Sequence, residues 1–124
     1  MKRILVIDDE AQVRTMLQGI LEDEGYEVQT ATNGHMGLQS YLSSPVDLVI
    51  VDIVMPEMAG IEVINLLNKC VPRPQIIAIS GGSRDTGATQ NLHIAKQLGA
   101  RHTMQKPVSY EVLIQTIEQT LNNQ

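Results

Sequence analysis

The chain has 124 residues, 43% of them hydrophobic, which is enough for one domain with a sizeable core. Its net charge of −5 and its nine scattered Lys and Arg residues argue against non-specific binding to nucleic acid, so we expect no direct DNA binding. The single cysteine excludes an internal disulfide, and no signal peptide, membrane span, linker or charged tail is evident. We therefore expect one cytoplasmic domain over residues 1–124 with no membrane contact.

Short apolar strands alternate with amphipathic helices along this sequence. We expect, in chain order, a strand at 4–7, a helix with its apolar stripe at 13–21 that ends at Gly25, a strand at 26–31, a helix at 34–42, a strand at 48–51, a helix at 61–70, a strand at 75–79, a helix at 88–98, a strand at 101–105, and a helix at 109–121. Ser109 is a suitable N-cap for the last helix.

Strands that are continuously apolar and separated by helices predict an α/β fold, in which helices cover both faces of a parallel sheet. The crossovers between such strands are right-handed. Ligands of these folds bind at the carboxyl ends of the strands, where the direction of winding reverses. Polar residues directly after each predicted strand are therefore the candidates for a functional site.

Chemically active side chains follow four of the five strands. Asp8 and Asp9 follow the first, Asp52 the third, Ser80 the fourth and Lys106 the fifth. If the carboxylates converge at one edge of the sheet, their repulsion raises their pKa values unless a cation lies among them. Three acids and an ammonium are suited to handling a phosphoryl group together with Mg²⁺.

These residues carry a resemblance to a known family, together with four further motifs: Met55-Pro56, Gly60, Gly99-Ala100 and Lys106-Pro107. Over its whole length the chain resembles the receiver domain of response regulators, of the single-domain, CheY-like chemotaxis type. The resemblance implies a flavodoxin-like, doubly wound sheet of five parallel strands in the order 2-1-3-4-5, with five helices.

The resemblance also assigns a metal site. It implies that Asp9, Asp52 and the backbone carbonyl of Val54 hold Mg²⁺, and that Asp8 orients the ion, commonly through water. Carboxylate and carbonyl oxygens are the ligands this cation prefers.

The resemblance further implies that Asp52 accepts a phosphoryl group from the phosphohistidine of a histidine kinase. Ser80 and Lys106 would then contact the phosphoryl oxygens. From the residues themselves, we expect the backbone N–H groups of Ile53 and Gly81 to complete the phosphate-binding cradle. Asp52 would act as a nucleophile and form an acyl phosphate.

The implied function is that of a stand-alone response regulator in a two-component phosphorelay. It is a signalling domain that catalyses its own phosphorylation and dephosphorylation, and it is not otherwise an enzyme. Its partners would be a sensor histidine kinase or a histidine phosphotransfer protein, and a downstream protein effector. The alternative is a phosphorelay intermediate that passes its phosphoryl group to a histidine phosphotransfer protein, and the sequence does not separate the two.

Two other classes of protein share part of this pattern. A flavodoxin-like flavin carrier would need Ser, Thr or Gly after its first strand, whereas Asp8-Asp9-Glu10 would repel a phosphate in the absence of a metal. A haloacid-dehalogenase-like phosphatase also has an aspartyl nucleophile after the first strand, but this chain has no segment for a cap domain. Visible absorbance would favour the flavin carrier, and sustained turnover of a phosphomonoester the phosphatase.

Departures from the family pattern concern the output of the signal. Thr103 stands where an aromatic switch residue is usual, and Val108 stands where Phe is usual. The stretch from Ser80 to Lys106 is also longer than usual and is rich in glycine. We therefore predict that segment 81–87, within the lengthened stretch 81–91, carries the conformational signal in place of an aromatic residue.

Overall fold

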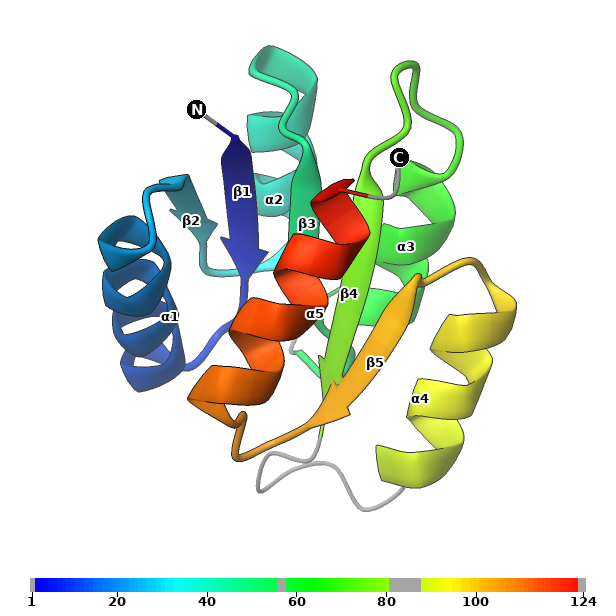
Figure 1. Ribbon diagram of the computed structural model, residues 1–124. Helices are drawn as coiled ribbons and strands as arrows, with labels where there is room; N and C mark the ends of the chain where they lie inside the picture. The colour runs from blue at the N-terminus through cyan, green and yellow to red at the C-terminus, as the bar shows by residue number, and fades with distance from the viewer. Residues whose placement is uncertain (1, 56–57, 81–87, 123–124) are drawn as a thin grey trace.

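The computed structural model describes residues 2–55, 58–80 and 88–122, with side chains given for all of these except 88–91. Five strands form one parallel sheet in the order β2-β1-β3-β4-β5 (Figure 1). Their bounds are β1 (Arg3–Ile7), β2 (Glu27–Ala31), β3 (Leu48–Asp52), β4 (Gln75–Ser80) and β5 (His102–Gln105). The predicted fold and strand order are confirmed.

Helices cover both faces of this sheet. They are α1 (Ala11–Asp23), α2 (Gly34–Ser43), α3 (Gly60–Leu67), α4 (Ala88–Gln97) and α5 (Tyr110–Asn122). Core residues of α1 and α5 pack on one face, and those of α2, α3 and α4 pack on the other. In Figure 1, α5 crosses in front of the sheet.

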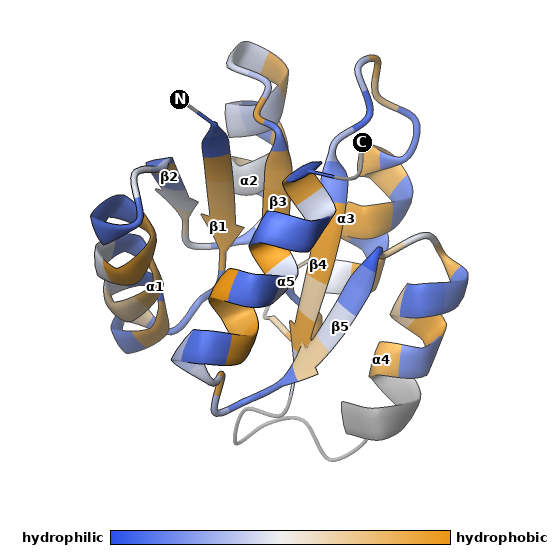
Figure 2. Cartoon of the chain, in the orientation of Figure 1, coloured by the Kyte–Doolittle hydropathy of each residue, from blue (hydrophilic) through white to orange (hydrophobic). Residues whose placement is uncertain are grey.

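The two faces of the sheet are built from alternating residues of the same strands, because successive side chains of a strand point in opposite directions. In β1, Ile4 and Val6 join the core cluster of α1 and α5, whereas Leu5 and Ile7 join the cluster of α2, α3 and α4. All four side chains are fully buried. Strands β1, β3 and β4 are accordingly the most hydrophobic in Figure 2, with the more polar β2 and β5 at the edges.

Most predicted element boundaries agree with the structure within a residue, and α3 is the exception. It ends at Leu67 rather than at the predicted Cys70. Beyond Leu67 the backbone N–H groups of Lys69 and Cys70 bond to carbonyls three residues back, which tightens the chain into a turn. The side chain of Asn68 donates to the carbonyl of Leu98 at 2.5 Å and so ties this turn to the end of α4.

The long connection between β4 and α4 includes residues 81–87, which lie outside the described residues. The predicted roles of Gly81 and of segment 81–87 therefore stay predictions. Among the helices that the structure does describe, none combines the length and the apolar character that crossing a membrane requires.

Candidate functional site

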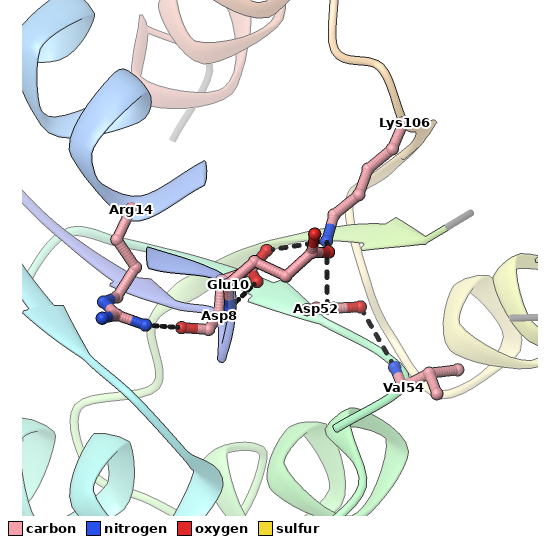
Figure 3. A network of polar contacts seen from close by, with 6 residues as sticks. All are labelled: Asp8, Glu10, Arg14, Asp52, Val54 and Lys106. Atoms are coloured by element: carbon pink, nitrogen blue, oxygen red, sulfur yellow. Dashed lines mark hydrogen bonds and ion pairs between the residues drawn. The ribbon is translucent and has the colours of Figure 1, made fainter. Parts of the chain in front are cut away.

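The carboxyl ends of neighbouring strands bring the predicted polar residues together, as Figure 3 shows for Asp8, Asp52 and Lys106. Ile7 pairs with Val51 across β1 and β3, so the residues that follow them, Asp8 and Asp52, emerge at the same edge. Lys106 follows β5, and its side chain reaches across to both carboxylates. Strand register therefore builds the site from residues that are far apart in sequence.

Lys106 is the centre of this site. Its ammonium nitrogen lies 2.6 Å from Glu10 Oε1, 3.0 Å from Asp8 Oδ2 and 3.1 Å from Asp52 Oδ2. The Lys106 side chain is only 8% exposed, so its contacts with the buried Asp8 and Asp52 are shielded from water. The sequence predicted repulsion among the acids unless a cation lies between them, and in this structure that cation is the lysine.

Asp8 is completely buried and held from several sides. Its Oδ1 accepts the backbone N–H of Glu10 at 2.9 Å, while its own backbone carbonyl accepts a hydrogen bond from Arg14 Nη1 at 2.8 Å. Its Oδ2 pairs with Lys106. Oδ1 is therefore hydrogen-bonded, whereas Oδ2 has an ion pair but no hydrogen bond among the described residues.

Asp52 is also buried, with 3% of the residue exposed. Burial raises the pKa of its carboxyl to about 6, with a further increase from the charge of Asp8 and a partial decrease from Lys106 and from the Val54 N–H. Burial alone would lower the pKa of Lys106, but the hydrogen bonds that its ammonium donates to Glu10 and Asp8 and the charge of Asp52 outweigh this effect, so that pKa is raised. The lysine thus stays protonated beside a carboxylate that is poised to ionise near neutral pH.

The donor set of the site fits a hard divalent cation. Carboxylate oxygens of Asp8, Glu10 and Asp52 all lie within 4.8 Å of one another. Oxygen ligands at such spacing suit Mg²⁺. Among the described residues this group contains Glu10 and not Asp9, although the sequence assigned a metal contact to Asp9. That assignment stays a prediction.

Ser80 ends β4 at the same edge and is fully buried. Its hydroxyl has no hydrogen-bond partner among the described residues, which is uncommon for a buried polar atom. Its backbone carbonyl accepts the N–H of Lys106 at 2.6 Å. The two residues predicted to contact phosphoryl oxygens are therefore linked directly.

The structure also shows the partners of two backbone N–H groups that follow β3. The Ile53 N–H donates to the carbonyl of Ile79 at 2.9 Å, so it is engaged in the sheet, and its predicted phosphoryl contact would require a change of partner. It is the Val54 N–H that donates to the Asp52 carboxylate, Oδ1, at 3.1 Å. Sequence reasoning assigned only the carbonyl of Val54.

Glu10 is a residue of this site that sequence reasoning did not assign to it. It directly follows Asp8-Asp9, and a third consecutive acid after the first strand was a signal for a larger acidic group. Position alone did not reveal that its side chain reaches Lys106, which is 96 residues away in sequence.

Comparison with known proteins matches this geometry to a family. Residues 4–118 match the model of the response regulator receiver domain. The chain belongs to this family. It is 37% identical to chemotaxis protein CheY of Thermotoga maritima, over 86% of both chains, and 35% identical to CheY of Bacillus subtilis, over 97% of this chain and 98% of that one. The crystal structure of a receiver domain protein from Clostridium thermocellum has a TM-score of 0.90 at 30% identity and covers 99% of this chain and 96% of its own.

Family membership makes the chain a receiver domain of the kind found in two-component response regulators, and so a signalling domain and not an enzyme in the usual sense. Receiver domains interact with histidine kinases and effectors and bind Mg²⁺ at an acidic pocket, for which Asp8, Glu10 and Asp52 are grouped here. Other relatives, including transcriptional regulators and a sensor kinase, are longer, and this receiver domain spans half of their length or less.

Proposed function

We propose that this receiver domain accepts a phosphoryl group on Asp52, in a reaction that depends on Mg²⁺, and changes conformation to control the binding of a protein partner. The observation that carries the proposal is the contact between Lys106 Nζ and Asp52 Oδ2 at 3.1 Å, within a buried acidic site. The donor would be the phosphohistidine of a histidine kinase or of a histidine phosphotransfer protein, in the cytoplasm.

In the proposed reaction, an oxygen of Asp52 attacks phosphorus and forms a carboxyl–phosphoryl bond, while the bond from phosphorus to the histidine nitrogen breaks. The histidine keeps the electron pair and takes up a proton. Such a transfer needs in-line positioning and neutralisation of the charge on the phosphoryl oxygens. The Lys106 ammonium and the buried Ser80 hydroxyl are the side chains at this edge that can meet those oxygens.

Mg²⁺, when bound, would supply further neutralisation of the phosphoryl charge. We assign its direct contacts to Asp9, Asp52 and the Val54 carbonyl, and an indirect contact to Asp8.

The test is phosphorylation by acetyl phosphate and Mg²⁺, followed by intact-mass measurement. We expect one added phosphoryl group that hydroxylamine removes, since hydroxylamine cleaves acyl phosphates. Asp52→Asn should abolish the addition. Asp23→Asn, which removes an exposed acid from the end of α1, is the matched control and should label normally. Full labelling of the Asp52 variant would contradict the proposal.

A further inference from the structure

Glu10 lies at the exposed edge of the site, directly before the first residue of α1. It occupies the N-cap position of α1 with an extended backbone, and its side chain makes no capping hydrogen bond. Its N–H donates instead to Asp8 Oδ1 at 2.9 Å. The helix therefore does not use the Glu10 carboxylate, which is consistent with the preference for shorter side chains such as Asp, Asn and Ser at N-cap positions.

The Glu10 carboxylate is engaged with Lys106. The distance of 2.6 Å between Oε1 and Nζ is shorter than those from Lys106 to Asp8 and to Asp52, at 3.0 and 3.1 Å. The Glu10 side chain is 44% exposed, whereas those of Asp8 and Asp52 are 0% and 5% exposed. Glu10 is thus the one of these three acids that can release the lysine by swinging into solvent.

The surroundings of Glu10 also place it beside a route into the site. Glu10 and Lys106 line a cavity of about 340 Å³ whose other walls include Val13, Met16 and Val108. Met16 is 42% exposed, so this side of the site is open to solvent. An ammonium has only three N–H donors, and here each can be directed at one carboxylate.

We propose that Glu10 is a positioning residue that holds the Lys106 ammonium before phosphorylation and competes with the phosphoryl group for it. The inference rests on the proposed phosphorylation of Asp52 and extends it to the regulation of that site. A phosphoryl group on Asp52 adds oxygens that need the lysine, and the ammonium must turn from Glu10 to reach them. Removing the Glu10 carboxylate should therefore favour the phosphorylated arrangement.

The first test is Glu10→Gln, which keeps the length of the side chain and removes its charge. We expect labelling by acetyl phosphate to become faster, and binding of beryllofluoride, followed by ¹⁹F NMR, to become tighter, each by about three- to tenfold. Asp23→Asn, at the other end of α1, changes the net charge equally and should alter neither the rate of labelling nor the affinity for beryllofluoride. Values equal to those of the unmodified protein would overturn the proposal.

A second variant separates contact from charge. Glu10→Asp keeps the negative charge but is one methylene shorter, so it should lose the contact with Lys106 and behave like Glu10→Gln. If the aspartate variant instead behaves like the unmodified protein, the charge of Glu10 acts at a distance and the proposed hold on Lys106 is wrong.

A third comparison tests whether Glu10 acts through Lys106. In a Lys106→Met background, Glu10→Gln should change beryllofluoride binding no further, because the coupling between contacting residues vanishes when one is absent. Mg²⁺ affinity, measured by titration calorimetry, should be unaltered by Glu10→Gln. A large loss of Mg²⁺ affinity would make Glu10 a metal ligand and refute its role as a positioning residue.

These outcomes also separate this inference from the proposed function. If the unmodified protein takes up neither a phosphoryl group nor beryllofluoride, the proposed function fails. If it takes up both and the Glu10 variants match it, only the role of Glu10 fails.

Discussion

Gly60 lies directly against the backbone of Asp52. A Cβ atom at position 60 would be 2.5 Å from Ile53 Cα and would overlap the carbonyl oxygen of Asp52. The Gly60 N–H also donates to the Ile53 carbonyl at 2.7 Å. The start of α3 thus fixes the backbone that carries the proposed nucleophile, and the space between them admits only glycine.

Gly60→Ala should therefore displace Asp52 and destabilise the protein by about 2–4 kcal/mol, because the obstructing atoms belong to the backbone and cannot move aside cheaply. Gly19→Ala is the control. Nothing lies within 4 Å of a Cβ at that position in α1, so it should stabilise the protein by up to about 1 kcal/mol. Urea unfolding measures both, and equal effects of the two substitutions would contradict the prediction.

Ser80→Ala should leave the stability of the unphosphorylated protein within about 0.5 kcal/mol of the original, because the buried hydroxyl has no hydrogen bond to lose among the described residues. The same change should weaken beryllofluoride binding, since the hydroxyl is expected to contact the phosphoryl oxygens. A thermal melt and a ¹⁹F NMR titration measure the two effects. A clear loss of stability without any change in binding would show that Ser80 is structural.

Asp52→Asn should alter how stability depends on pH when a chelator removes metal ions. The folded carboxyl has a pKa of about 6 against an ordinary value of 3.8, so the folded protein holds this proton more tightly than the unfolded chain. Its contribution to stability is present at low pH and is lost as pH rises through the window from 3.8 to about 6. The free energy of unfolding of the variant, relative to that of the original protein, should therefore rise across that window by on the order of 2 kcal/mol. A constant difference from pH 4 to 7 would show that the pKa is not raised.

Substitutions of the two adjacent acids should affect Mg²⁺ binding unequally. We expect Asp9→Ala to abolish binding, because it removes a proposed direct ligand, and Asp8→Ala to weaken it less, because it removes only a proposed indirect contact. Titration calorimetry gives the two affinities. The reverse order would exchange the direct and indirect roles.

Lys106→Ala should retain Mg²⁺ binding and accept a phosphoryl group, yet fail to convert phosphorylation into a conformational change. The ammonium is the group that the phosphoryl oxygens attract, and without it the predicted conformational change loses its driving force. Hydrogen exchange of the phosphorylated variant should therefore match that of its unphosphorylated form. A pattern of protection like that of the phosphorylated original protein would refute this role.

The sequence predicted the fold and the edge at which the site lies, for a physical reason. Buried strands need an almost unbroken run of apolar residues, as residues 48–51 provide in β3. The charged residue that ends such a run, here Asp52, therefore marks the end of the strand. Once the strands are parallel, Asp8, Asp52 and Lys106 have to meet at one edge. The strand order itself came from the family resemblance and not from the apolar pattern.

Contacts set by individual side chains and turns were not predictable in the same way. The reach of Glu10 to Lys106 depends on the side-chain conformation of a half-exposed residue, and no local pattern encodes it. Which N–H meets Asp52 depends on the turn after β3, which directs that of Val54 to the carboxylate and that of Ile53 to the sheet. The early end of α3 likewise follows from the tertiary contact between Asn68 and Leu98.

The hydrogen bond from the Lys106 N–H to the Ser80 carbonyl has a mechanical consequence. It extends the pairing of β4 and β5 by one more hydrogen bond, of 2.6 Å, between two residues whose side chains are both proposed to contact the phosphoryl group. A displacement of Ser80 through its hydroxyl is therefore transmitted to the main chain of Lys106. The ends of β4 and β5 should therefore move together on phosphorylation. A partner protein that binds at either strand end would then respond to the same conformational change.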